Sequence, residues 1–301
     1  MSAELMQALR HILGGRARFG EPLAGHTTWG IGGPAWCHGR AHSAAEAKAV
    51  VRAAAKAGVP VKALGRGSNL LVADGGFAGV MLSLKGELAR VEIEGQTMRA
   101  GGGAHLPAAV KLAARLGLSG LEWAAGIPGS VGGAIAMNAG ASGGQISDVL
   151  AEVDLLLPDA SRQTLPAAAL KPAYRRGGLP AGALVLMATL RLGAGDPQAV
   201  AARTRAVLER RRASQPLDRR TAGSVFKNPP GDHAGRLIEA AGLKGHSVGP
   251  AVVSPRHANF IENQGGASAA QVLQLMDQVR HKVRERFGVD LEPEVEVVGH
   301  V

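Results

Sequence analysis

The chain is poor in cysteine and has no long apolar run. Its 301 residues include a single cysteine, Cys37, so an intramolecular disulfide cannot form and a thiolate-rich zinc site is excluded. No apolar run approaches the roughly 18–20 residues that a membrane helix needs, and no charged segment followed by an apolar stretch opens the chain. The sequence therefore predicts a soluble protein, most simply a cytoplasmic one, without membrane insertion.

Aromatic residues are also scarce, which bears on the excess of basic charge. The formal net charge is +10, whereas aromatic residues make up 3% of the chain. Such a charge favours an anionic partner, but nucleic-acid-binding proteins usually concentrate their basic residues and add stacking aromatics. The densest groups, Arg210–Arg212 and Arg219-Arg220, fit a solvated helix end, although they could also steer an anionic substrate. We expect no nucleic-acid partner.

The common enzyme motifs are missing as well. No G-x-G-x-x-G follows a strand and opens a helix, and no Walker A, H-E-x-x-H or G-x-S-x-G sequence occurs. The ten histidines include no short pair with metal-ligand spacing, so we expect no metal. A Rossmann nucleotide site is therefore unsupported.

Hydrophobic periodicity and capping signals predict an α+β chain rather than regular βαβ units. Ser43 and Glu46, and again Ser268 and Gln271, have the spacing of a helix capping box. The expected helices cover 43–57, 106–116, 197–213, 233–241 and 268–287. The expected strands cover 59–64, 70–73, 91–94, 149–157, 184–192, 251–254, 259–262 and 295–298.

The chain has 43 glycines, and they form clusters in three places, at 27–35, 64–71 and 126–140. Glycine permits positive φ and close approach, so successive N–H groups can converge on phosphate oxygens. One such loop by itself is more often a plain turn. Three of them, with hydroxyl and amide side chains alongside, favour a dinucleotide cofactor held without a Rossmann helix.

These clusters carry motifs that resemble a known family. They read T-T-W-G-I-G-G-P-A, then L-G-R-G-S-N-L-L-V, then G-I-P-G-S-V-G-G-A-I-A-M-N-A-G-A. The C-terminal third adds A-G-S-V-F-K-N-P at 222–229 and L-E-P-E-V at 291–295, with R-H-A-N-F-I between them. In this order the motifs resemble the UDP-N-acetylenolpyruvoylglucosamine reductases (MurB) over about 26–299. The chain has no room for the tyrosine-bearing insertion of the longer members, so it resembles the shorter class.

The resemblance implies a non-Rossmann FAD-binding fold of the vanillyl-alcohol-oxidase/PCMH type plus a C-terminal α+β substrate domain. The implied domains are 1–55 with 288–301 and 56–194 for FAD, and 195–287 for substrate. The implied cofactors are FAD and NADPH, the partners are NADPH and a nucleotide sugar, and a monomer is expected.

The resemblance also implies a reaction. NADPH reduces FAD, and flavin N5 then delivers hydride to C3 of UDP-N-acetyl-3-O-(1-carboxyvinyl)-glucosamine. Protonation of C2 yields UDP-N-acetylmuramate, a peptidoglycan precursor needed for cell-wall biogenesis, cell shape and cell division. Two alternatives remain open: another FAD oxidoreductase of the same fold that acts on an alcohol, and a basic binding protein without chemistry.

Three side chains are implied to be catalytic. Ser224 matches the proton donor to C2, Arg175 matches the family's Y-R segment, and Glu294 matches the second Glu of L-E-P-E-V. A guanidinium fork suits the substrate carboxylate, but the adjacent Arg176 competes for the assignment. Without the family, these positions read as a turn serine, a surface arginine and a solvent-facing acidic stripe shared with Glu292 and Glu296.

The resemblance further assigns binding residues. The substrate-binding candidates are Tyr174, Lys227, Asn228 and His257, although packing is an equally good explanation for His257. The candidates for cofactor binding are Gly32, Gly33, Gly65, Arg66, Gly67, Ser68, Asn69, Leu70, Gly126, Ile127, Pro128, Gly129, Ser130, Gly132, Gly133, Asn138 and Ala139.

Overall fold

The computed structural model describes residues 2–299, and its contacts divide them into two compact units. The first unit contains the chain up to residue 20 together with 36–65 and 78–210. The second contains 21–35, 66–77 and the chain from 211 onward. Strands and helices occur in both units, which confirms the predicted α+β class.

One sheet of the first unit packs against two N-terminal helices. Its strand order is β1-β2-β5-β3. Apolar side chains of α1, α2, β2 and β5 form one continuous core that includes Cys37. The bounds are α1 Ala3–Leu13, β1 Ala17–Pro22, β2 Pro34–Ala41, α2 Ala44–Lys56, β3 Val61–Ala63 and β5 Phe77–Leu84.

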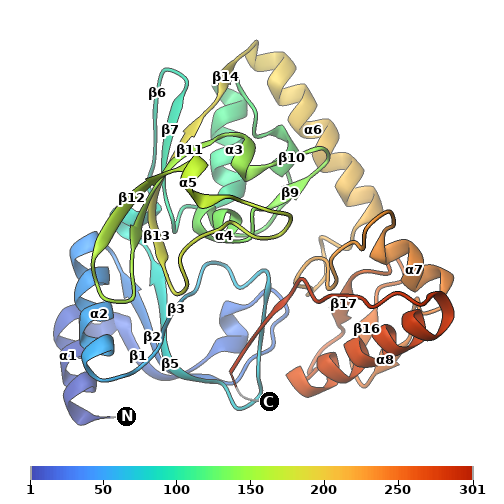
Figure 1. Cartoon of the computed structure of the whole chain (residues 1–301), viewed down its shortest axis with the longest axis horizontal. Coiled ribbons are helices and arrows are strands. Elements are labelled where there is room, and N and C mark those ends of the chain that lie inside the picture. Colours follow the sequence, from blue (N-terminus) through green and yellow to red (C-terminus); the bar gives the residue numbers. More distant parts are fainter. Residues whose placement is uncertain (1, 300–301) are drawn as a thin grey trace. The chain divides into compact units, whose positions relative to one another are not determined.

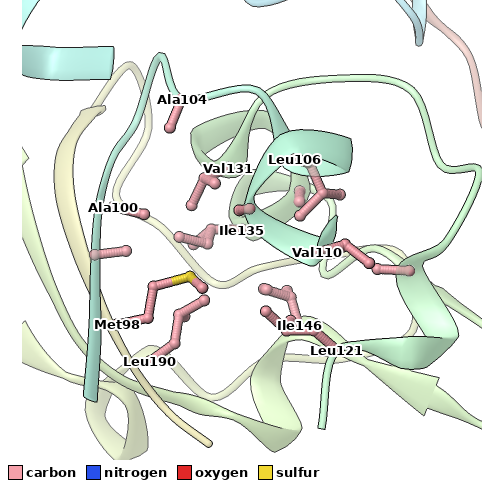
Figure 2. Close-up of a cluster of buried hydrophobic side chains, with 14 of the residues drawn as sticks. Met98, Ala100, Ala104, Leu106, Val110, Leu121, Val131, Ile135, Ile146 and Leu190 are labelled. Carbon is pink, nitrogen blue, oxygen red and sulfur yellow. The ribbon is translucent and has the colours of Figure 1, made fainter. Parts of the chain in front are cut away.

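The other large sheet of this unit is antiparallel, in the order β12-β11-β13-β7-β6 (Figure 1). Figure 2 shows Met98, Ala100 and Leu190 from its strands facing apolar side chains of α3 and α4. The bounds are β6 Val91–Glu94, β7 Thr97–Gly101, α3 Leu106–Arg115, α4 Val131–Ala136, β11 Leu150–Leu156, β12 Arg162–Pro166 and β13 Leu184–Arg191. The unit's shorter elements are β8 Leu118–Ser119, β9 Gly140–Ala141, β10 Gly144–Gln145, α5 Ala167–Leu170 and β14 Gly193–Ala194, and α6 Pro197–Ser214 follows them.

The second unit combines a three-stranded sheet, β15-β16-β17, with helices α7 and α8. A separate parallel pair joins β4 to β18. Buried side chains of α7, α8, β16 and β17 share one core with Trp29 and Phe226. The bounds are β4 Leu70–Val72, α7 Ala234–Ala240, β15 Ser247–Val248, β16 Ala251–Val253, β17 Ile261–Asn263, α8 Ala269–Phe287 and β18 Glu296–Val298.

Helices with clear capping signals are confirmed. Ser268 and Gln271 form the predicted reciprocal capping box of α8, and Gly288 ends that helix in the left-handed conformation. Helix α4 lies in a glycine-rich segment for which no helix was predicted, and α1 also lacked a prediction. In residues 2–299, no helix combines the length and the apolar content that a bilayer crossing requires.

Four predicted strands begin later than expected, and two of them, β17 and β18, adjoin candidate site residues. Strand β17 begins at Ile261, because the backbone turns before it and Phe260 N donates to the His257 carbonyl at 3.0 Å. Strand β18 begins at Glu296, so Glu292 and Glu294 precede the strand and the same-face argument does not apply to them.

Candidate functional site

The second glycine cluster touches each of the other two. In the first unit, a Cβ atom on Gly65 would lie 2.6 Å from Ser130 Oγ. In the second unit, Gly67 has φ +60°, and a Cβ there would collide with the His26 carbonyl oxygen. Thr28 N also donates to the Gly67 carbonyl at 3.2 Å. Each of these two glycines therefore packs closely against another loop of its own unit, and a side chain is excluded at both.

The first cluster is anchored by β17. Trp29 is fully buried, and its Nε1 donates to the Ile261 carbonyl at 2.7 Å. Asn263 Nδ2 donates to the Trp29 carbonyl at 2.8 Å. Gly32 and Gly33 follow, and Gly33 N donates to the Ala73 carbonyl at 3.0 Å, which ties this loop to the end of β4.

The third cluster uses several of its amides inside the first unit. Ser130 caps α4 by accepting the N–H of Gly133 at 3.2 Å. The amides of Val131 and Gly132 donate to the carbonyls of Ala104 (2.9 Å) and Gly102 (2.8 Å). Those bonds hold the start of α4 against the turn after β7. Contact of the cluster's candidates with a cofactor stays a prediction.

Asn138 ends this cluster, and its side chain is bonded to protein on several sides. It is buried, with a left-handed φ of 42°. Its Nδ2 donates to Gln145 Oε1 and to the Ala173 carbonyl, both at 3.1 Å, and its Oδ1 accepts from Ser147 N at 3.2 Å. Asn138 therefore connects the glycine cluster to the segment that carries Arg175.

Arg175 lies at the tip of a two-residue turn. The main chains of Ala173 and Arg176 exchange two hydrogen bonds, of 2.8 and 3.0 Å, and Arg175 has φ +56°. The Arg175 guanidinium carbon lies 4.9 Å from the ring centroid of Tyr174. Arg175 is half-buried, whereas Arg176 is exposed. The turn therefore gives the two arginines different surroundings.

In the second unit, Ser224 and Glu294 lie on hydrogen-bonded segments. Glu294 N donates to the carbonyl of Val225, the residue after Ser224, at 2.8 Å. The Glu294 carbonyl accepts from Asn69 Nδ2 at 3.1 Å, so a candidate cofactor residue fixes the main chain of a candidate catalytic one. Arg66, Ser68 and Leu70 belong to the same loop as Asn69, and Leu70 begins β4.

Lys227 and Asn228 follow Ser224 and have partners in the unit. Lys227 N donates to the Glu292 carbonyl at 2.8 Å, and Lys227 Nζ pairs with Glu292 Oε1 at 2.5 Å. Asn228 Oδ1 accepts from Ala234 N at 3.1 Å at the start of α7. The Glu292 side chain is 69% exposed, so a phosphate can displace it from Lys227 at little cost.

His257 is held as a neutral imidazole. Its Nδ1 accepts from Asn259 N at 3.2 Å, which places the ring proton on Nε2. Burial lowers the pKa of His257 from its ordinary value, and the positive charge of Lys244 adds to this effect. The ring packs edge-on against Phe260, with centroids 4.9 Å apart. His257 can therefore offer one N–H donor to a ligand.

Asn259 belongs to the R-H-A-N-F-I motif, and the sequence assigns it no role. It is 4% exposed, and its side chain bonds to the main chain of Phe226. In the sequence, Asn259 is an amide residue between Ala258 and Phe260. Local patterns alone do not distinguish such a residue from one in an ordinary turn.

The fold and the loops fit a flavin dinucleotide. A glycine loop in which a side chain is excluded at Gly65 and Gly67 can present main-chain N–H groups to the phosphates of a large anionic cofactor. A family model described as an FAD binding domain matches residues 39–165. A glucooligosaccharide oxidase from Acremonium strictum shares the fold with a TM-score of 0.50 at 18% identity, over 93% of this chain and 58% of that chain. The protein belongs to the class of proteins that carry this FAD binding domain.

Proteins with higher sequence identity to this chain identify its family within this class. The model of the UDP-N-acetylenolpyruvoylglucosamine reductase C-terminal domain matches residues 215–298. The chain is 48% identical to UDP-N-acetylenolpyruvoylglucosamine reductase 2 of Symbiobacterium thermophilum, over 98% of this chain and 97% of that protein. Identity to the reductase of Moorella thermoacetica is 46%, over 93% and 92%. The crystal structure of the reductase (MurB) from Thermus caldophilus superposes with a TM-score of 0.83 at 39% identity, over 94% of this chain and all of that one. The chain belongs to the UDP-N-acetylenolpyruvoylglucosamine reductase family.

Proposed function

We propose that this chain reduces UDP-N-acetyl-3-O-(1-carboxyvinyl)-glucosamine to UDP-N-acetylmuramate, a step of peptidoglycan precursor synthesis. The observation that carries the proposal is similarity at 48% identity along nearly the whole chain to a reductase named for this substrate. When bound, FAD supplies to C3 of the substrate a hydride that comes from NADPH. The protein acts as a cytoplasmic monomer of the shorter class.

Ser224 donates the proton that C2 requires after hydride addition. A serine hydroxyl is a weak acid, so it serves only when the acceptor carbon is strongly basic and the hydroxyl is held close. The hydrogen bonds of the neighbouring Val225 to Asn259 and Glu294 support such a fixed position.

Arg175 binds the substrate carboxylate, on which negative charge grows during hydride addition. Its planar fork can donate two parallel hydrogen bonds to that carboxylate, and the contact stabilises the transition state more than the ground state. Glu294 lies beside the reacting group and helps to orient the enolate-like species.

The remaining candidates bind ligands. Lys227, Asn228, His257 and Tyr174 contact the nucleotide sugar, with Lys227 on the pyrophosphate. The three glycine clusters hold FAD. We assign 1–55 with 288–301 and 56–194 to FAD binding, and 195–287 to substrate binding.

The direct test is an anaerobic two-step titration of the purified protein. Addition of NADPH is expected to bleach the flavin absorbance near 450 nm, and addition of the enolpyruvyl nucleotide sugar is expected to restore it with formation of UDP-N-acetylmuramate. If a simple alcohol reduces the flavin and the nucleotide sugar does not reoxidise it, the protein is instead an oxidoreductase of another substrate class. A purified protein that neither contains nor binds FAD would contradict the proposed reaction, because that reaction requires the flavin.

A further inference from the structure

We propose that Asn259 is a positioning residue that holds the Ser224 hydroxyl in reach of the substrate carbon. The proposal rests on the proton-donor role of Ser224 given above. Asn259 contacts the chain next to Ser224 and acts through that contact.

The side chain of Asn259 forms two hydrogen bonds with the main chain of one residue of the Ser224 segment, Phe226. Its Nδ2 donates to the Phe226 carbonyl at 2.8 Å, and its Oδ1 accepts from Phe226 N at 3.0 Å. Its own carbonyl accepts from Val225 N at 2.9 Å. One residue therefore makes three hydrogen bonds to the two residues that follow Ser224.

The Asn259 side chain adds hydrogen bonds that no regular β-ladder supplies at Phe226. Strand β17 begins only at Ile261, and the residues before it turn, with Asn259 N bonded to His257 Nδ1. A regular ladder cannot pair with the Ser224 segment at that point. The amide of Asn259 replaces it, since an asparagine side chain presents the same donor and acceptor pair as a peptide.

The other side of the segment is held by Glu294. Glu294 N donates to the Val225 carbonyl at 2.8 Å, and the Phe226 side chain is 2% exposed. Val225 is thus fixed between Asn259 on one side and Glu294 on the other. These bonds on both sides of Val225 form a clamp that fixes the main chain of Ser224 relative to that of Glu294, and both residues are catalytic candidates.

A clamp of this kind matters most for proton transfer. Misplacement of a reacting group by about 1 Å can cost roughly 100-fold in rate. Ser224 has no part in the transfer of hydride from NADPH to the flavin. Loosening the clamp is therefore expected to slow reoxidation by the nucleotide sugar and to leave flavin reduction nearly unchanged.

The test compares Asn259→Asp with a matched variant of another buried amide. Asn259→Asp keeps the acceptor and replaces the donor with an anion that faces the Phe226 carbonyl. Asn263→Asp makes the same change at a residue that is 6% exposed and whose Nδ2 donates to the Trp29 carbonyl instead. Thermal midpoint and FAD content are measured for both, followed by the two half-reactions in anaerobic stopped flow.

We expect both variants to have a lower thermal midpoint. Asn259→Asp is expected to slow reoxidation by about 10- to 100-fold while NADPH reduction changes less than about threefold. The solvent deuterium isotope effect on its reoxidation step is expected to exceed that of the wild type, because proton transfer becomes limiting. In Asn263→Asp, any loss is expected to fall equally on the two half-reactions.

Other outcomes overturn the inference. It fails if Asn259→Asp is reoxidised at the wild-type rate, or if both variants lose reoxidation selectively and to the same extent. If Asn259→Asp does not fold, Asn259→Ser, which retains one short hydrogen-bonding group, is measured in the same way and decides by the same criteria. A wild-type enzyme that the nucleotide sugar does not reoxidise refutes the proposed function itself, a result distinct from failure of the variant alone.

Discussion

Arg175 and Arg176 are adjacent in sequence, yet their backbone geometry separates them. Arg175 occupies the left-handed position at the tip of the turn and lies over the Tyr174 ring, whereas Arg176 pairs its main chain with Ala173. A non-glycine residue in the left-handed region is strained and persists where the surroundings hold it. The half-buried Arg175 is therefore the better candidate for a fixed guanidinium.

This difference predicts unequal effects of the same substitution. Arg175→Lys keeps the charge but removes the planar fork, so we expect kcat to fall by about 100-fold, as when one strong charge-stabilising donor is lost. Arg176→Lys is expected to change kcat less than threefold. Steady-state kinetics with saturating NADPH measures both, and equal losses would mean that the register set by Tyr174 is wrong.

Substitution of Ser224 is expected to affect only one of the two half-reactions. Ser224→Ala removes the proposed proton donor but no group that we propose for flavin reduction, so NADPH should bleach the flavin at close to the wild-type rate. Reoxidation by the nucleotide sugar should fall by at least about 1,000-fold, which lies within the contribution of a positioned general acid. Single-turnover stopped flow separates the two steps. Unchanged reoxidation would remove Ser224 from the mechanism.

At the scale of elements, the start of α2 shows a predicted cap with an unpredicted partner. Ser43 Oγ accepts from Glu46 N at 3.1 Å, as the spacing indicated. The Glu46 carboxylate does not complete the box; it accepts two bonds from Arg16, of 2.6 and 2.7 Å, and one from His42 N. The pKa of Glu46 is lowered to about 2, mainly because its carboxylate accepts hydrogen bonds from Arg16.

Glu46→Gln should therefore destabilise the first unit. Since the folded pKa lies below the unfolded value of 4.5, the stabilisation is present above pH 4.5 and is lost as the pH falls towards 2. The pair is partly exposed, so we expect a loss of roughly 1–2 kcal/mol at pH 7. Urea unfolding from pH 7 down to pH 3 should show the difference from wild type narrowing with acidity. Glu92→Gln on the exposed face of β6 is the control, and a difference that does not depend on pH would contradict the charge-based explanation.

At the scale of the whole molecule, the position of the single cysteine bears on how FAD is held. The related oxidase of Acremonium strictum carries FAD attached through a cysteine and a histidine. Here Cys37 is fully buried in the core of the first unit, and burial raises the pKa of its thiol to about 12. A neutral thiol in an apolar core is a poor nucleophile towards flavin.

We therefore expect no link between FAD and Cys37, and we predict that FAD is bound without any covalent link, through histidine or cysteine. Acid or heat denaturation should release all of the flavin into the supernatant, where its fluorescence and mass identify FAD. In the native protein, Ellman's reagent should find less than about 0.1 reactive thiol per chain, rising to one in denaturant. Flavin that stays with the precipitated protein would instead favour the alternative of an alcohol-oxidising relative.

Much of the fold could be predicted because its signals are local. Capping residues and apolar periodicity located α2, α3 and α8 to within a residue or two, since a helix start depends on neighbours three or four positions away. Helix α4 escaped prediction because its glycines disfavour a helix. Helix α4 is stabilised instead because Val131 and Ile135 pack into the core that includes Met98 and Leu190 of the sheet (Figure 2).

The sequence by itself determined the family and the FAD-binding class, because the order of its glycine and serine motifs is specific. Only the tertiary structure decided what Asn69, Asn138 and Asn259 contact. An asparagine donor is the same group whether it meets a ligand or a carbonyl of its own chain. Which acceptor comes within hydrogen-bonding distance depends on segments far away along the chain, and here those acceptors belong to Glu294, Ala173 and Phe226.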